Sequence, residues 1–193
     1  MNQTAKKTRF LVYNALFIAL IAVMQITGLG LIRLGVINIT FYCTVIAVGT
    51  LFLGLKSGLV QGFAFGSISL YSALTAPSGL VAPILGESWL LVVLMCYIPR
   101  LLVPVAVHLG YKLIMKLSNQ DKLALALGSA AGSLTNSVLY LGILMLCYIP
   151  LFAQYPAVPA TVGGVVLYGS IPEFIAAGII APPLVMALRK IRR

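Results

Sequence analysis

Residues 88–107 read SWLLVVLMCYIPRLLVPVAV, an apolar run that a single charged side chain, Arg100, interrupts. A helix of about 20 apolar residues is long enough to cross the hydrocarbon core of a bilayer. The rest of the chain has the same character, because 61% of the 193 residues are hydrophobic and only 8% are charged. A typical soluble domain is about 25% charged. The sequence therefore predicts an all-α integral membrane protein with lipid around most of its surface.

Five further apolar stretches flank this run, and the breaks between them hold charged residues or the turn formers glycine and proline. Three of these breaks are long enough to act as outer loops that cap a binding site. The length suits one domain, so we predict a single six-helix membrane domain over residues 1–193. Its predicted transmembrane helices are residues 10–29, 38–55, 57–75, 88–115, 122–149 and 163–188.

Basic residues outnumber acidic residues by 13 to 3, and the formal net charge is +10. The bases stand beside the apolar stretches, which is the pattern of membrane insertion and argues against nucleic-acid binding. With the N-terminus inside, eleven of the thirteen bases face the cytoplasm, and only Arg33 lies in an outer loop. The positive-inside rule then predicts that both termini are cytoplasmic. The apolar run from Phe10 is longer than that of a signal peptide, so we expect the first helix to be retained.

The sequence lacks the motifs of nucleotide hydrolysis and of metal catalysis. The nearest approach to a P-loop, GTLFLGLKS at 49–57, has one residue too many before its lysine and ends a membrane helix. His108 is the single histidine, so the paired-histidine spacing of a metal site does not occur. The cysteines Cys43, Cys96 and Cys147 lie far apart in apolar runs, as small hydrophobic residues do. We therefore expect no enzyme activity, no cofactor and no metal.

Polar residues within the apolar stretches are the strongest functional signal, since ionisable side chains are costly inside a membrane. At 1.5 Å per residue, Arg100 lies about 18 Å below the outer end of its helix, Glu173 about 15 Å and Asn136 about 20 Å. One interpretation is a structural ion pair of Arg100 with Glu173, with Asn136 as a third partner. The other is a ligand pocket open to the outside, in which the guanidinium binds a carboxylate through two hydrogen bonds.

Aromatic and amide side chains near these three residues are candidates for the pocket wall. Tyr97 is about one turn before the arginine, and Tyr140 is four residues after Asn136 on the same helix face. Trp89 and Gln25 lie nearer the outer rim, where aromatic residues are more often interfacial anchors. The predicted substrate-binding residues are Arg100, Asn136, Glu173, Tyr97, Tyr140, Trp89 and Gln25.

Small residues at four-residue spacing let membrane helices approach each other closely. Glycines with this spacing mark the third and fifth stretches, and we expect them to pack helices together. Ala15 and Ala19 form a similar pair in the first stretch, which fits either internal packing or a docking surface for another membrane subunit. The glycines are Gly58, Gly62 and Gly66 in the third stretch and Gly128 and Gly132 in the fifth.

Three motifs make the whole chain resemble a known family. They are NALFIA at 14–19, GLKSG at 54–58 and GSAAGSLTNS at 128–137. With the chain length and the six apolar stretches, they resemble the S components of energy-coupling factor transporters, the vitamin-binding membrane subunits of bacterial importers. The last motif is the most specific, and it is most similar to the pantothenate-type S components.

The resemblance implies a multi-pass subunit of the bacterial cytoplasmic membrane that binds a vitamin from outside and topples in the bilayer to deliver it. It also implies three partners, a transmembrane coupling subunit and two cytoplasmic ATPases, with Ala15 and Ala19 in contact with the coupling subunit. Pantothenate is the favoured ligand, because its carboxylate suits Arg100 and its amide and hydroxyls suit Asn136. Folate, biotin and a pyrimidine precursor stay open as ligands.

Two other classes of function are compatible with the residues alone. A stand-alone proton-coupled carrier would use Glu173 as its proton site and would take up its substrate without partner subunits. A scaffold or assembly protein would bind a partner stably but would retain no small ligand.

Overall fold

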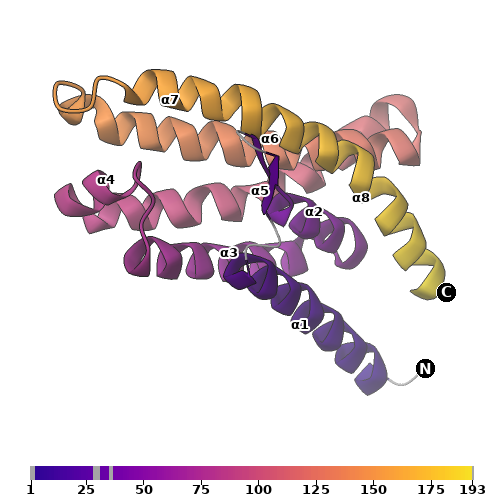
Figure 1. Cartoon of the computed structure of the whole chain (residues 1–193). Helices are drawn as coiled ribbons and strands as arrows, with labels where there is room; N and C mark the ends of the chain where they lie inside the picture. Colours follow the sequence, from indigo (N-terminus) through magenta and orange to yellow (C-terminus); the bar gives the residue numbers. More distant parts are fainter. Residues whose placement is uncertain (1–2, 28–30, 35–36, 193) are drawn as a thin grey trace.

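Long helices form most of the chain in the computed structural model, which describes residues 3–27, 31–34 and 37–192 (Figure 1). The elements are α1 (Gln3–Thr27), the strands β1 (Leu31–Leu34) and β2 (Ile37–Thr40), α2 (Tyr42–Leu53), α3 (Leu55–Thr75), α4 (Ala82–Glu87), α5 (Trp89–Ser118), α6 (Asp121–Tyr148), the 3-10 turn η1 (Ile149–Leu151), α7 (Val158–Val165), the π-helical turn η2 (Val166–Ser170) and α8 (Ile171–Arg192).

The helices α5 and α6 lie side by side at the centre of the bundle, joined by a short turn. α3 packs against α5, and α8 packs against α6. Figure 1 shows the start of α1 and the end of α8 on the same side of the molecule as the turn between α5 and α6, while α4 lies at the opposite end. One end of the bundle therefore holds the start of α1 and the end of α8, and we call it the terminal end. The opposite end holds α4.

Four helical stretches among the described residues are long and apolar enough to cross a membrane. They coincide with the first, fourth, fifth and sixth predicted transmembrane helices, and they are compatible with the predicted integral membrane protein. These stretches are Lys7–Thr27, Trp89–Ser118, Asp121–Leu151 and Val158–Ile191.

The other two predicted positions are occupied by α2 and α3. α2 has 12 residues, which span about 18 Å at 1.5 Å per residue, against a hydrocarbon core about 30 Å thick. α3 has 21 residues but is less apolar, because Lys56, Ser57 and Gln61 lie in its first two turns. Six transmembrane helices with cytoplasmic termini therefore stay a prediction.

Two of the differences from the predicted helix boundaries have a clear structural cause. The second helix begins at Tyr42 rather than at residue 38, because Ile37–Thr40 pairs antiparallel with Leu31–Leu34 as a hairpin. The sixth helical stretch begins at Val158 rather than at residue 163 and includes the π-helical turn before α8. Backbone pairing and helix irregularity both depend on neighbouring segments, which hydropathy alone does not report.

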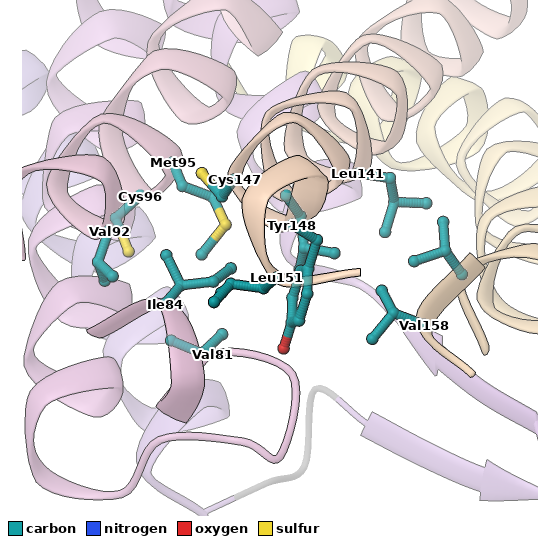
Figure 2. Packing of buried hydrophobic residues seen from close by; sticks show 12 residues of the cluster. Val81, Ile84, Val92, Met95, Cys96, Leu141, Cys147, Tyr148, Leu151 and Val158 are labelled. Carbon is teal, nitrogen blue, oxygen red and sulfur yellow. The ribbon is translucent and has the colours of Figure 1, made fainter. Parts of the chain in front are cut away.

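Apolar side chains from α4, α5, α6, α7 and the adjoining connections form one cluster at the end of the bundle opposite the termini (Figure 2). Tyr148 is fully buried there, and its hydroxyl donates a hydrogen bond to the Leu80 carbonyl at 2.9 Å. This bond ties the connection between α3 and α4 to the end of α6. The buried members are Val81, Ile84, Val92, Met95, Cys96, Leu141, Leu144, Cys147, Tyr148, Leu151, Val158 and Val162.

The glycines of α3 and α6 lie where helices approach closely, as the sequence predicts. A β-carbon at Gly62 would overlap the backbone oxygen of Arg100, and one at Gly66 would lie 2.9 Å from the Tyr97 ring. In α6, a β-carbon at Gly128 would lie 3.0 Å from the backbone of α5. The expectation that these glycines pack helices together is confirmed.

We expect Gly62→Ala to lower the melting temperature of the detergent-solubilised protein. The added methyl group meets backbone, which cannot rotate away, and overpacking of this kind costs about 1–3 kcal/mol. Gly142→Ala in α6 is the matched control, because a β-carbon there meets nothing within 4 Å. Equal melting temperatures for the two variants would contradict the close approach of α3 and α5.

Candidate functional site

A cavity of about 300 Å³ brings together five of the seven predicted substrate-binding residues. Its walls come from α1, α2, α3, α5, α6 and the segment from α7 to α8. The lining residues are Gln25, Tyr42, Phe65, Ser69, Arg100, Asn136, Ser137, Tyr140, Leu141, Val165, Gly169, Ser170 and Glu173. Arg100, Asn136 and Glu173, which the sequence places at similar depths in the membrane, therefore line one common cavity.

Arg100 is buried, with 8% of its surface exposed. A backbone carbonyl of α5 that lacks its usual helical partner holds the side chain in place. In a regular helix the Met95 carbonyl accepts from the N–H four residues later, but that residue is Pro99, which has no N–H. The Arg100 guanidinium takes this role, because its Nη1 donates to the Met95 carbonyl at 2.8 Å. Pro99 thus leaves an acceptor free on the same face as the arginine.

Two aromatic rings flank the Arg100 guanidinium. Its carbon lies 4.7 Å from the centre of the Tyr140 ring and 5.3 Å from that of Phe65. A cation over an aromatic face is stabilised by the ring quadrupole, more so when it is desolvated. Within the described residues, Arg100 Nε is buried without a hydrogen-bond partner. The cation is therefore held by the protein with one of its donors unpaired, and its residue lines the cavity.

Glu173 is also buried, with 7% of its surface exposed, and it lies in the first turn of α8 directly after the π-helical turn. Turns of π-helix are frequent at functional sites. Glu173 thus brings a buried carboxyl group to the cavity that Arg100 also lines.

Asn136 completes the polar part of the cavity wall from α6. Its Oδ1 atom is buried and has no hydrogen-bond partner within the described residues. An amide has an acceptor and two donors, so this oxygen lacks a hydrogen bond that it could accept, and its residue lines the cavity. Ser137 and Ser170 add hydroxyls to the same wall.

A smaller cavity of about 210 Å³ adjoins the first. The two share Gln25, Ser69, Arg100 and Tyr140 among their lining residues, so Arg100 faces both. The smaller cavity extends toward the connection after α3, with the hydroxyls of Ser72 and Ser78 on its wall. The charged guanidinium thus lies at the junction of two polar spaces.

Two predicted wall residues lie elsewhere. Tyr97 lines neither cavity, because it faces α3, where its hydroxyl is 2.9 Å from Ser67 Oγ and its ring is 5.4 Å from that of Phe63. Trp89 is 68% exposed at the start of α5 and also lines neither. The structure therefore gives Tyr97 a packing role, and it leaves Trp89 at a surface position that suits an interfacial anchor.

Several lining residues were not predicted from the sequence. Tyr42 begins α2, and Phe65 and Ser69 lie four residues apart on α3. The glycine spacing of α3 could have pointed to Phe65 and Ser69, because it indicates that α3 packs closely against another helix, which is α5 with its arginine. Tyr42 carried no such signal in the sequence, because the hairpin that places the start of α2 depends on β-pairing.

Ala15 and Ala19, the predicted docking residues, are both exposed on α1. Their neighbour Asn14 is buried and attaches α1 to α3, because the Ser57 hydroxyl donates to Asn14 Oδ1. Gln61 extends this contact by donating to Ser57 Oγ at 3.0 Å. The polar contact fixes the rotation of α1, and the two alanines remain on its outer surface.

Comparison with known proteins adds two findings. The family model described as "ECF transporter, substrate-specific component" matches residues 9–189. The curated protein "Pantothenic acid transporter PanT" of Lactococcus lactis subsp. cremoris (strain MG1363) is 27% identical to this chain over 190 residues, with 92% of each protein covered.

Proposed function

We propose that this chain, which belongs to the family of ECF transporter substrate-specific components, binds pantothenate as the vitamin to be imported. It captures the ligand from outside the cell, and partner subunits drive uptake. A transmembrane coupling subunit and two cytoplasmic ATPases are the expected partners.

The observation that carries the choice of ligand is the state of Arg100. A buried cation is costly unless an anion or hydrogen-bond acceptors compensate it. Arg100 has a single recorded hydrogen bond among the described residues, to the Met95 carbonyl, and it faces the cavity. A carboxylate that accepts two hydrogen bonds from the guanidinium adds a direct charge-assisted contact. Neutral and cationic vitamins offer the guanidinium no such carboxylate.

Size and polar chemistry also support pantothenate over folate. A cavity of about 300 Å³ is at the lower end of the range for ligand pockets, about 300–1,000 Å³, and folate is about twice as large as pantothenate. Asn136, Ser170 and Glu173 offer donors and acceptors that match the amide and hydroxyls of pantothenate. The similarity to a protein named as a pantothenic acid transporter supports the same choice.

Isothermal titration of the purified protein in detergent, without nucleotide or partner subunits, tests the proposal. We expect pantothenate to bind at least about tenfold more tightly than pantothenol, which corresponds to about 1.4 kcal/mol. Pantothenol carries an alcohol in place of the carboxylate, so the comparison isolates the charge. Equal affinity for the two compounds, or binding of thiamine or riboflavin in their place, would exclude pantothenate as the specific ligand.

Reconstitution into liposomes tests the stand-alone carrier. Such a carrier would use Glu173, a buried carboxyl group in the cavity. A substrate-specific component without its partners is expected to bind pantothenate but to accumulate none under a pH gradient. Accumulation that Glu173→Gln abolishes would favour the proton-coupled mechanism.

A further inference from the structure

A separate cavity of about 460 Å³ lies where the end of α8 meets the start of α6. It is lined by Lys122, Pro182, Pro183, Met186, Ala187 and Lys190. This cavity shares no lining residue with the vitamin site, and its nearest residue on α8, Pro182, lies about 14 Å further along the helix than Glu173, at 1.5 Å per residue. We infer that it binds the phosphate headgroup of an anionic phospholipid.

The acidic residue closest in sequence to Lys122 is already paired with another base. Asp121 is the nearest acidic residue in the sequence, and its carboxylate accepts from Arg189 Nη1 at 2.9 and 3.1 Å and from the Tyr111 hydroxyl at 2.8 Å. In the described residues, no ion pair is recorded for Lys122 or Lys190. Both ammonium groups therefore remain available to an anion from outside the protein.

The remaining wall of the cavity is apolar. Pro182, Pro183, Met186 and Ala187 present carbon surface beside the lysines, on a helical stretch that is apolar and long enough to cross a membrane. A lysine beside apolar surface keeps its charge at the headgroup level while its stem covers carbon. Basic pockets between membrane helices on the cytoplasmic side suit anionic lipid headgroups.

The position favours a lipid over a soluble phosphate compound. The site lies at the terminal end of the bundle, which the positive-inside rule predicts to be cytoplasmic, and its apolar wall continues along α8 toward the bilayer. An acyl chain can lie against this wall while the phosphate meets the lysines. A soluble phosphate has no group that would occupy the apolar part.

Native mass spectrometry of the full chain in detergent, titrated with cardiolipin or with phosphatidylcholine, tests this inference. We expect cardiolipin to bind preferentially and expect K122Q/K190Q to weaken cardiolipin binding by about tenfold or more, since each basic residue near an anionic lipid contributes to binding. K112Q/K116Q is the matched control, because it removes the same charge from α5 near the same end, where neither residue lines the cavity.

Three results would overturn the assignment. Equal loss of cardiolipin binding in both double variants would show that net charge alone attracts the lipid. Equal binding of cardiolipin and phosphatidylcholine would remove the headgroup preference. Competition of cardiolipin by millimolar inorganic phosphate would point to a free-anion site. Circular dichroism and gel filtration of each variant show whether it has kept its fold, and pantothenate titration of the same samples reports separately on the vitamin site.

Discussion

Arg100→Ala is expected to weaken pantothenate binding by about 100-fold or more, equivalent to about 2.7 kcal/mol. The substitution removes a charge-assisted hydrogen-bonding group from a buried site, and it leaves the ligand carboxylate desolvated without a cation. Binding of the neutral pantothenol should change much less, because it has no carboxylate to lose its partner. Isothermal titration of both compounds against the same preparation measures the difference.

Two further variants separate charge from geometry at this position. Arg100→Lys retains a positive charge but lacks the planar fork of donors, so we expect it to recover only part of the lost affinity. Lys116→Ala removes an exposed positive charge from the same helix and should leave binding unchanged. Unchanged pantothenate affinity in a folded Arg100→Ala protein would refute the site, and an equal loss for pantothenol would indicate a purely structural arginine.

Ala15→Leu/Ala19→Leu is expected to reduce uptake by about tenfold or more while pantothenate binding is retained. Both alanines are exposed on α1, and neither lines the cavity that contains Arg100. Small side chains allow close approach of membrane helices, so two leucines would separate α1 from the coupling subunit. Uptake by proteoliposomes that contain all the partner subunits, compared with titration of the isolated chain, resolves the two effects.

The matched control is Ala160→Leu, because Ala160 is an exposed alanine of α7 on a different part of the molecule. It should change neither uptake nor binding. Normal uptake by the double α1 variant would exclude this face as the docking surface. Loss of binding together with uptake would mean that the two leucines disturb the Asn14–Ser57 contact that attaches α1 to α3.

Positions along the helices could be predicted well from the sequence alone. A rise of 1.5 Å per residue is nearly constant in α-helices, so residue counts gave Arg100, Asn136 and Glu173 similar depths. These three side chains do line one cavity, together with Tyr140 and Gln25. Rotation about the helix axis was harder to predict, because α5 is apolar on every face and its prolines disturb the regular turn. Tyr97, about one turn from Arg100, accordingly faces α3 instead of the cavity.

The sequence by itself determined that the chain forms membrane helices, because the length of an apolar stretch can be counted in the sequence. It also determined which polar residues lie within those stretches, where an ionisable side chain is too costly to be kept without a role. Only the tertiary structure decided how Arg100 is held. Its contacts are the Met95 carbonyl that Pro99 leaves free and the rings of Phe65 and Tyr140. The tertiary structure also decided that α2 and α3 contribute to the wall of the cavity. Such contacts arise from the rotation and packing of neighbouring helices, which no single segment of the sequence specifies.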